Sequence, residues 1–169
     1  QLKANGKDVA HEEEGNIVSE TLKANGEDTA PAVGMLNQYV KDLSVENPNA
    51  PESFNWTDAP QIDVQFNIGA REINEEVSEI ELKISINSKH QAGTAFIVEL
   101  SYGGLIGMRN MEEQHKHAFS YAEAPRLLFP FARRVISEAV RDAGFPPLML
   151  DPIDFGALYM SQQGQVGNA

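Results

Sequence analysis

The sequence predicts an α+β fold, because strand patterns fill the first part of the chain and helical patterns fill the second. Four segments alternate apolar and polar residues with a period of two, which is typical of strands with one buried face. The segments with a helical apolar stripe follow them. Strands that precede helices in this way favour α+β over an alternating α/β order. The 169 residues are enough for one domain with a buried core.

The first predicted strand covers about residues 36–46 and is the most informative segment. Leu43 and Val45 occupy one set of alternate positions, and we expect their side chains to be buried. Asp42 and Glu46 occupy the other set, so we expect both carboxylates to face outward from the sheet.

Three further strands are predicted, and the lengths of their connections indicate how they pair. They cover about residues 61–70, 77–88 and 94–102, and Gly103-Gly104 is expected to end the last of them. The connections between these three strands are short, which favours antiparallel hairpins. Residues 47–60 are too long for a tight hairpin and contain prolines that cannot donate within a sheet, so we expect a crossover there.

Two helices are expected in the rest of the chain. Pro125 suits the first turn of a helix, and an apolar stripe continues from there to Val140. Pro130 must begin the regular part or kink it, because proline has no N–H to donate. Gly144 is a natural helix end, and Asp154 is placed to cap a short last helix.

The composition divides the chain into three parts. Residues 1–34 are polar and acidic and contain no aromatic residue other than His11, so we predict a disordered acidic extension. Within it, residues 2–10 return with few changes as residues 22–30. Two copies are too few for a solenoid, and we interpret the duplication as a solubilising tail. The folded domain is expected over residues 35–160 and a flexible tail over residues 161–169.

The overall composition restricts the classes of partner. A net charge of −12 argues against nucleic acid, since phosphate binding needs a basic surface, and favours a basic protein partner. The absence of cysteine excludes disulfides and thiolate metal sites and suits a reducing compartment. We expect no membrane insertion, because the sequence has neither an apolar run of spanning length nor an apolar signal segment near its start.

No arrangement of residues in the sequence indicates catalysis. His115 and His117 are two positions apart, so on a helix they cannot chelate one ion as an i, i+4 pair can. There is neither a phosphate loop ending in lysine nor a G-x-S-x-G motif. The alternative is an acyl-thioester or small-ligand enzyme on a sheet-around-helix fold. That enzyme needs an inward polar residue on its central helix, and the apolar stripe offers none, so we expect no enzyme, cofactor or metal.

Two groups of residues are candidates for binding. If the first and fourth strands are neighbours, Asp42 and Glu46 lie close to Ile97 and Glu99, on the same side of the sheet. Such a patch can dock a cationic partner, although the pattern alone favours an ordinary solvated sheet face. The second group consists of bulky aromatics that either pack as core or line a groove between the crossover and the last helix. These aromatics are Phe54, Trp56, Phe155 and Tyr159.

Several runs of residues, in the same order along the chain, resemble the SecB family of bacterial protein-export chaperones. They are residues 41–51, 99–104, 128–133 and 145–155, within a similarity that extends from about Met35 to Met160. The resemblance implies a four-stranded antiparallel sheet with two helices packed on one face, in a homotetramer built as a dimer of dimers. It also implies an ATP-independent cytoplasmic chaperone that keeps unfolded precursor proteins translocation-competent and delivers them to the ATPase SecA.

The resemblance also assigns roles to individual positions. The basic, zinc-bearing tail of SecA meets the acidic sheet face of the family at the positions of Asp42, Glu46, Ile97 and Glu99. Subunit assembly involves the positions of Val98, Leu100 and Tyr102. The candidates for the groove that holds unfolded clients are Phe54, Trp56, Phe155, Leu158 and Tyr159. We recognise no counterpart of residues 1–34 in the family.

Overall fold

The structure is a computed structural model that describes residues 29–166. The prediction of a disordered extension with a duplicated segment therefore lies outside the described residues, apart from its last few positions. Of these, Ala32 already belongs to the first strand, which begins earlier than the alternation at residues 36–46 indicated. The last helix continues to Val166, beyond the predicted domain end at Met160.

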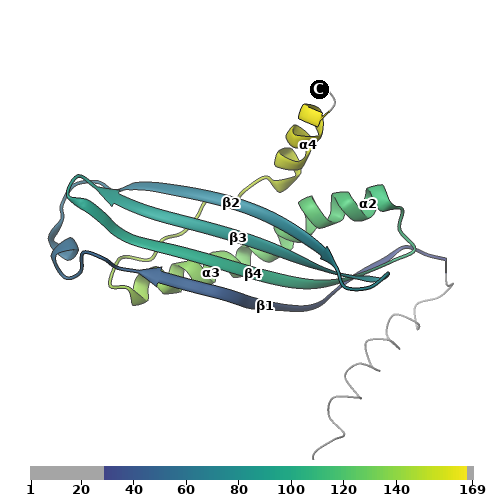
Figure 1. Ribbon diagram of the computed structural model, residues 1–169, viewed down its shortest axis with the longest axis horizontal. Coiled ribbons are helices and arrows are strands. Elements are labelled where there is room, and N and C mark those ends of the chain that lie inside the picture. Colours follow the sequence, from purple (N-terminus) through teal and green to yellow (C-terminus); the bar gives the residue numbers. More distant parts are fainter. Residues whose placement is uncertain (1–28, 167–169) are drawn as a thin grey trace, which may run out of the picture.

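Four antiparallel strands form one sheet in the order β1-β4-β3-β2 (Figure 1). The strands are β1 (Ala32–Glu46), β2 (Gln61–Glu72), β3 (Val77–His90) and β4 (Gly93–Arg109). Consecutive strands β2, β3 and β4 are neighbours, which confirms the two predicted hairpins. The chain between β1 and β2 passes from one sheet edge to the other, as expected for a crossover, and contains the short 3₁₀ helix η1 (Glu52–Asn55).

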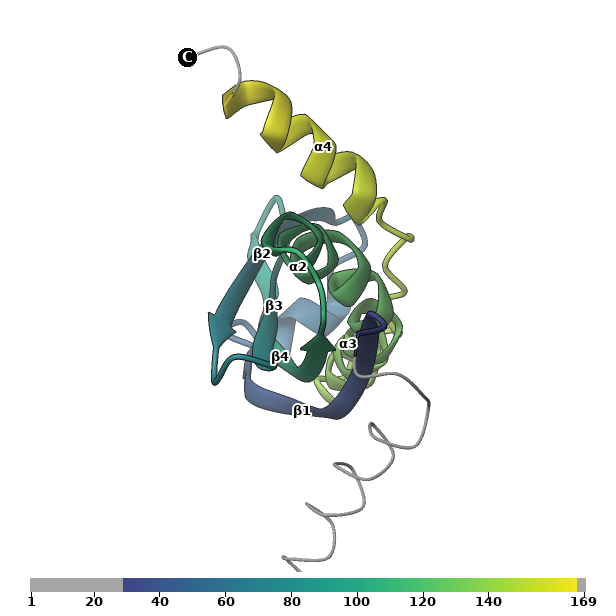
Figure 2. The same ribbon diagram turned by 90° about the vertical axis from the view of Figure 1, so that its right-hand side faces the viewer.

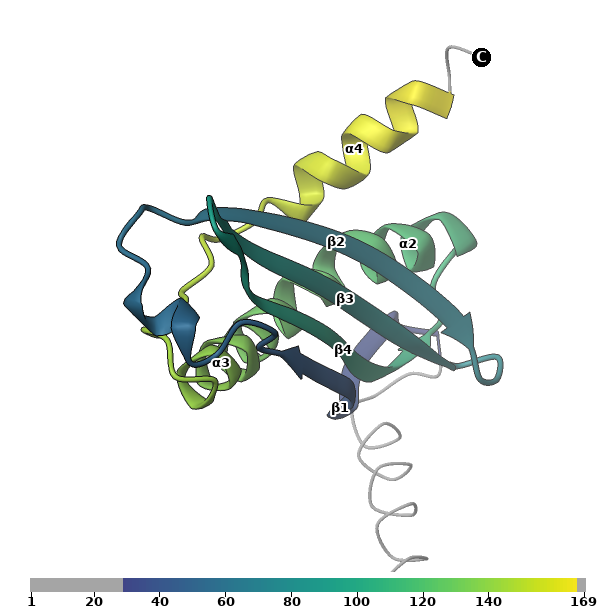
Figure 3. The ribbon, with the colours of Figure 1, turned by 60° about the vertical axis from the view of Figure 1, so that its left-hand side comes forward.

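The helices cover one face of this sheet. They are α2 (Glu113–Ala118), the π-helical turn η2 (Phe119–Glu123), α3 (Ala124–Asp142) and α4 (Phe155–Val166). Seen along the sheet, α2 and α3 lie on the same side, whereas α4 projects past the β2 edge (Figures 2 and 3). The predicted α+β class and its antiparallel sheet with helices on one face are confirmed.

The helical stretch begins earlier than expected. It starts at Glu113 rather than at Pro125, and it continues past Pro130 without ending. Pro125 has no N–H to donate to the preceding turn, and the π-helical turn η2 lies directly before it. Asp154 caps α4 as predicted, because its Oδ1 accepts a hydrogen bond from Ala157 N at 2.9 Å.

The core lies between the sheet and α3. Alternate residues of β3 and β4 point toward the helices and are almost fully buried, as the period-two pattern predicted. From α3, the side chains of Leu128, Ala132, Ile136 and Val140 pack onto them. These four positions recur every four residues and form the buried stripe of the helix.

The prediction that Gly103-Gly104 ends the fourth strand is wrong, because β4 continues to Arg109. The two glycines permit close contacts on opposite faces of the sheet. A Cβ at Gly103 would lie 2.6 Å from a ring carbon of Tyr39, and one at Gly104 would lie 2.8 Å from a methyl of Leu128. Glycine at these positions therefore serves a close approach of neighbouring side chains rather than a turn.

The expected burial of Leu43 and Val45 is also wrong. Their side chains lie on the helix side of β1, but they are 42% and 41% exposed. The physical reason is the position of α3, which contacts β4 and β3 and leaves most of β1 uncovered. The same edge also exposes Val33, Met35 and Val40.

Candidate functional site

The acidic face is the outer surface of the sheet, opposite the helices, where β1 pairs with β4. In this register Ser44 lies opposite Glu99, and Glu46 lies opposite Ile97. Asp42 is two residues before Ser44 on the same face, so it is diagonal to Glu99. The structure thus brings together the four side chains predicted to form an acidic patch, and their role toward SecA stays a prediction.

The three carboxylates of the predicted patch have no side-chain partner within the described part of the chain. Asp42, Glu46 and Glu99 are exposed, and none of them shares an ion pair or a side-chain hydrogen bond with another described residue. Ile97 is half-buried between them. Their negative charge is therefore available to a cationic partner.

Two other carboxylates of the outer face are paired. The Glu79 side chain, only 8% exposed, accepts hydrogen bonds from Lys41 Nζ at 2.8 Å and from Tyr39 Oη at 2.5 Å. These bonds, that of Lys41 first, lower the pKa of Glu79 to about 2. Glu81 accepts a hydrogen bond from Ser101 Oγ at 2.6 Å, which lowers its pKa. The outer face thus separates paired carboxylates on β3 from unpaired ones on β1 and β4.

A β-bulge places Lys41 in this cluster. The register of β1 against β4 shifts between Val40 and Asp42, so Lys41 is an extra residue in the strand. The Tyr39 ring lies over Gly103 on β4, which lets its hydroxyl reach Glu79 on β3. The bulge and the glycine together allow β1 to reach across its neighbour to the strand beyond.

A hollow of about 510 Å³ crosses the outer face beside these charges. All four strands contribute to its lining, and Asp42, Glu99, Lys41 and Lys83 supply its charges together with Glu81. A lining of charged and amide side chains suits an extended polar segment better than an apolar one.

A second hollow lies on the helix side, at the end of the sheet where the crossover runs. Its volume is about 460 Å³, and its walls are mainly aromatic rings and prolines. Phe54 and Trp56 come from the crossover, Phe96 from β4, and Phe145 from the segment after α3. The Phe145 ring bridges the others, at 5.1 Å from the Phe54 ring and 5.0 Å from the Phe96 ring between centroids. We call this space the crossover hollow.

Polar side chains fasten the crossover over this hollow. Asn47 Nδ2 donates to Ala143 O at 2.7 Å, and Asn49 Nδ2 donates to Thr94 O at 2.8 Å. Asp58 accepts hydrogen bonds from the Gln91 backbone N–H at 3.0 Å and from His90 Nδ1 at 2.9 Å. The first of these contributes most to lowering the pKa of Asp58, and the second adds to it.

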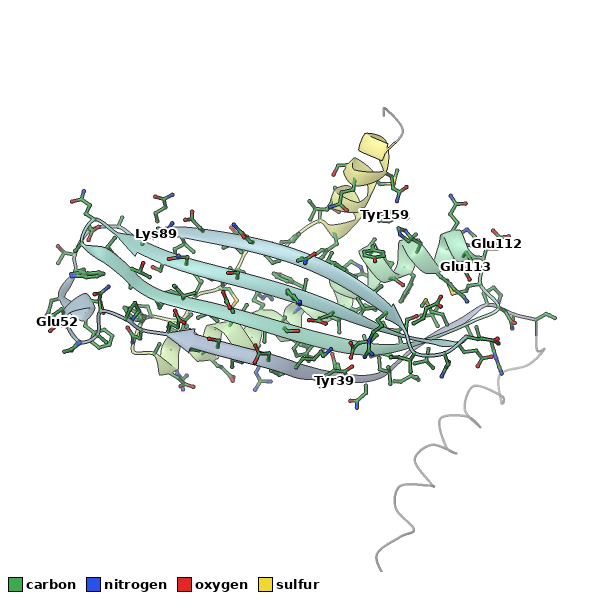
Figure 4. The ribbon with its side chains drawn as sticks, viewed as in Figure 1. Tyr39, Glu52, Lys89, Glu112, Glu113 and Tyr159 are labelled. Atoms are coloured by element: carbon green, nitrogen blue, oxygen red, sulfur yellow. The ribbon has the colours of Figure 1, made fainter. Side chains whose placement is uncertain are left out.

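The predicted groove residues from α4 lie elsewhere. Phe155 is 1% exposed and packs edge-on against the rings of Phe66 and Phe129 in the core. Leu158 and Tyr159 line a separate hollow of about 360 Å³ beside β2, which shares no lining residue with the crossover hollow. Figure 4 shows this separation, with Glu52 in the crossover at one end of the molecule and Tyr159 on α4 away from it. The five predicted groove residues therefore do not form one groove in this structure.

The residues predicted for subunit assembly lie inside the protomer. Val98, Leu100 and Tyr102 are 0%, 2% and 7% exposed under the helices, and burial raises the pKa of Tyr102. Their neighbours across the β1–β4 pair, Val45 and Leu43, are the exposed ones. An interface at this edge would contact the side chains of β1, which lie between β4 and the partner. The assignment of Val98, Leu100 and Tyr102 to subunit assembly stays a prediction.

Neither metal binding nor membrane crossing is indicated by the described residues. Over residues 29–166, no group of three or more His, Cys, Asp or Glu side chains is placed to hold a metal ion. None of the helices described there is long and apolar enough to cross a membrane. His117, which the sequence analysis considered as a metal ligand, is hydrogen-bonded instead: its Nδ1 lies 2.8 Å from the hydroxyl oxygen of Tyr159.

The sequence did not indicate several residues that shape these surfaces. Tyr39 and Glu79 meet across an intervening strand, and Asp58 meets His90 from a loop 32 residues earlier. No local periodicity signals such contacts. Phe145 could have been found, because a bulky aromatic followed by two prolines in a loop must pack somewhere.

These features together define a class of protein. An α+β domain with exposed carboxylates on one face and apolar hollows on the other offers both charge and apolar surface, which is the combination expected of a protein that binds other polypeptides.

Comparisons with known proteins place the chain within this class. The family model for the preprotein translocase subunit SecB matches residues 26–166. The match includes the end of residues 1–34, so the expectation that this segment lacks a counterpart is wrong for that part. The protein-export protein SecB of Novosphingobium aromaticivorans is 61% identical over 158 residues, which is 90% of this chain and 91% of that protein. That of Erythrobacter litoralis is 59% identical over 141 residues, which is 83% of this chain and 79% of that protein. The chain belongs to the SecB family, which confirms the resemblance and the predicted function of a protein-export chaperone.

A solved structure supports the fold independently of close sequence similarity. The SecB-like chaperone of Mycobacterium tuberculosis, in complex with a ChAD peptide from an antitoxin, superposes with a TM-score of 0.61 at 12% identity. The match covers 72% of this chain and 90% of that one. At this identity the likeness concerns the fold alone.

Proposed function

We propose that this chain is a cytoplasmic, ATP-independent chaperone that holds unfolded precursor proteins for export and delivers them to SecA. The observation that carries the proposal is the presence of two chemically different surfaces on one fold. Aromatic hollows lie on the helix side, and unpaired carboxylates lie on the outer face of the sheet. Holding an unfolded chain requires apolar contact, whereas docking on a basic tail requires charge, so the two tasks suit separate surfaces.

Client binding is assigned to the crossover hollow and to the hollow beside α4. Burying one Leu- or Phe-sized side chain contributes about 1.5–3 kcal/mol, and ordering an unfolded segment offsets much of it. One hollow alone therefore binds weakly and with little sequence preference. Several copies on one assembly, acting on one long client, raise the overall affinity through effective concentration. Release needs no hydrolysis, because a partner can compete for the complex.

We assign the assembly, a homotetramer built as a dimer of dimers, to the uncovered edge of the sheet. Besides the aliphatic side chains of β1, α3 exposes two apolar side chains, since Leu127 and Phe131 are 41% and 48% exposed. Phe129 of the same helix contacts Phe66 on β2, so helical geometry places Leu127 and Phe131 on the opposite side of α3. An apolar surface of this kind on a folded chain marks an interface with another polypeptide.

The alternative of an acyl-thioester or small-ligand enzyme is not favoured. Such an enzyme needs a polar group on the inward face of its central helix. The buried residues of α3 are all apolar, from Ala124 to Val140. This face therefore offers a substrate no acid, base or nucleophile.

Docking of SecA on the acidic face is tested by reversing two of its unpaired charges. Asp42→Lys with Glu46→Lys should weaken SecA binding by at least tenfold, because a cationic tail then meets like charges. The measurement is the dissociation constant for SecA by calorimetry, together with the delay that the chaperone imposes on folding of a precursor.

The matched control makes the same change of net charge elsewhere, at the exposed carboxylates Glu72→Lys and Asp151→Lys. This control should bind SecA as the original chain does. Both variants should still delay precursor folding. Equal loss of SecA binding in the two variants would assign the effect to net charge and contradict docking at this face.

A further inference from the structure

The crossover hollow contains two buried hydroxyl groups, those of Ser53 and Ser88. Ser53 is 3% exposed and Ser88 is 1% exposed, and both line the hollow. Among the described residues, neither Oγ has a hydrogen-bond partner. Buried hydroxyls are nearly always hydrogen-bonded, because leaving them unsatisfied is unfavourable. Two such groups in one apolar hollow therefore indicate a ligand that supplies their hydrogen bonds.

The surroundings of Ser88 show why its hydroxyl stands out. In the strand register, Ile62 of β2 and Phe96 of β4 flank it directly on the same face. Ser88 thus lies in the middle of an otherwise apolar row across three strands, at a position where an aliphatic residue would pack as core. Ser53 lies in η1 of the crossover, so the two hydroxyls belong to different walls of the hollow.

The chemistry of the hollow selects the kind of ligand. A serine hydroxyl both donates and accepts, which matches the N–H and C=O that every peptide unit carries. The rings of Phe54, Phe96 and Phe145 supply apolar contact beside them. A ligand that offers both features in alternation is an extended peptide segment with apolar side chains. Its main chain is the same whatever the sequence, so hydrogen bonds to it add affinity without adding sequence preference.

We propose that Ser53 and Ser88 hydrogen-bond the main-chain amides of an extended apolar client segment bound in the crossover hollow. This inference rests on the proposed client-binding function and adds polar recognition of the main chain to it. The hydroxyl oxygens are covered in the structure, so an entering segment must displace a wall. The Phe54 ring is the wall that can give way, since it is 48% exposed and rests on Gly144 and Phe145.

The test combines serine variants with a change in the client main chain. The probe is a fluorescent ten-residue peptide rich in Leu and Phe, compared with the same peptide carrying amide-to-ester exchanges at its central residues. The exchange removes N–H donors and weakens the acceptors while keeping the shape. Dissociation constants are measured for the full chain, for Ser53→Ala, for Ser88→Ala and for the double variant. The control is Ser120→Ala, a buried serine of η2 that does not line this hollow.

Each lost hydroxyl should weaken binding of the amide peptide by about two- to tenfold, the range of a neutral hydrogen bond. The original chain should bind the ester peptide more weakly than the amide peptide. The double variant should show a smaller difference in affinity between the two peptides. Ser120→Ala should behave as the original chain. Ser53→Ala and Ser88→Ala should keep or raise the melting temperature, because each removes a buried hydroxyl that has no partner among the described residues.

Several outcomes overturn the inference, and they can be told apart. If the alanine variants bind the amide peptide as the original chain does, while Trp56→Ala weakens binding, client binding stands and the serine assignment fails. The same holds if the double variant responds to the ester exchange as strongly as the original chain. If the original chain does not bind the peptide at all, the client-binding function fails together with the inference.

Discussion

At the scale of single residues, the arrangement of charges on the outer face depends on a glycine in β4 that leaves room for the ring of a tyrosine from β1. Tyr39 lies over Gly103 and donates to Glu79 on the strand beyond. This contact, with that of Lys41, removes the charge of Glu79 from the surface available to partners. The period-two alternation of β3 puts Glu79 on the outer face. Its partners could not be predicted, because they depend on strand order and on a bulge in β1.

The first prediction at this scale concerns acid sensitivity. The pKa of Glu79 is about 2, against an ordinary value of 4.5. Its contribution to the free energy of unfolding is therefore complete above pH 4.5 and is lost as the pH falls toward 2. Glu79→Gln should lower that free energy at neutral pH by about 1.5–3 kcal/mol, the range for hydrogen bonds to charged groups. It should also flatten the decline between these pH values, as measured by urea unfolding.

The control is Glu99→Gln, which changes an exposed carboxylate without a described side-chain partner. This variant should retain the stability and the acid dependence of the original chain. A Glu79→Gln variant that loses stability in acid as steeply as the original chain would contradict the assignment of that loss to Glu79.

At the scale of elements, the end of α3 and the crossover depend on each other. Gly144 has a φ of +96°, and a Cβ there would lie 2.8 Å from the Phe54 ring. The helix end thus requires glycine for its backbone conformation and also for the close approach of the crossover. The sequence predicted the helix end at Gly144 but not the ring packed on it, since that contact joins segments far apart in the chain.

The second prediction follows from this contact. Gly144→Ala should lower the free energy of unfolding by about 1–2 kcal/mol, through the left-handed backbone conformation alone. It should also displace Phe54 and reduce the hydrogen-exchange protection of the crossover at residues 52–58, measured by mass spectrometry. Gly69→Ala is the matched control, because a Cβ at Gly69 in β2 meets no atom within 4 Å. Equal exchange in the two variants would show that Gly144 does not hold the crossover.

At the scale of the whole molecule, the local patterns predicted the sheet but not which parts of it are covered. The alternation in β1 correctly divides Asp42 and Glu46 from Leu43 and Val45. Whether the aliphatic side faces core or solvent depends on where α3 lies, and the pattern of one strand does not contain that information. The path of the chain after α3 is likewise non-local, and it separates the crossover hollow from the hollow beside α4.

The third prediction uses the uncovered edge. Phe131→Asp should reduce the assembly from four chains to a smaller species, because a charge would be buried at an apolar interface. The measurement is the mass by size-exclusion chromatography with light scattering. Ile73→Asp is the matched control, since Ile73 is also 48% exposed but lies in the turn between β2 and β3. A single-chain mass for the original protein would contradict the proposed homotetramer.

The separation of paired and unpaired carboxylates on the outer face has a consequence for how ionic strength acts on this chaperone. At 0.1 M salt, the attraction between exposed charges is largely screened beyond about 10 Å, and the screening length shortens as salt rises. Contacts between apolar groups do not weaken under the same conditions. Rising salt should therefore reduce capture by a basic partner at Asp42, Glu46 and Glu99 while clients remain held. Client binding and delivery to the basic partner would then depend differently on salt. Raising the salt concentration alone would therefore block delivery while the client stays bound.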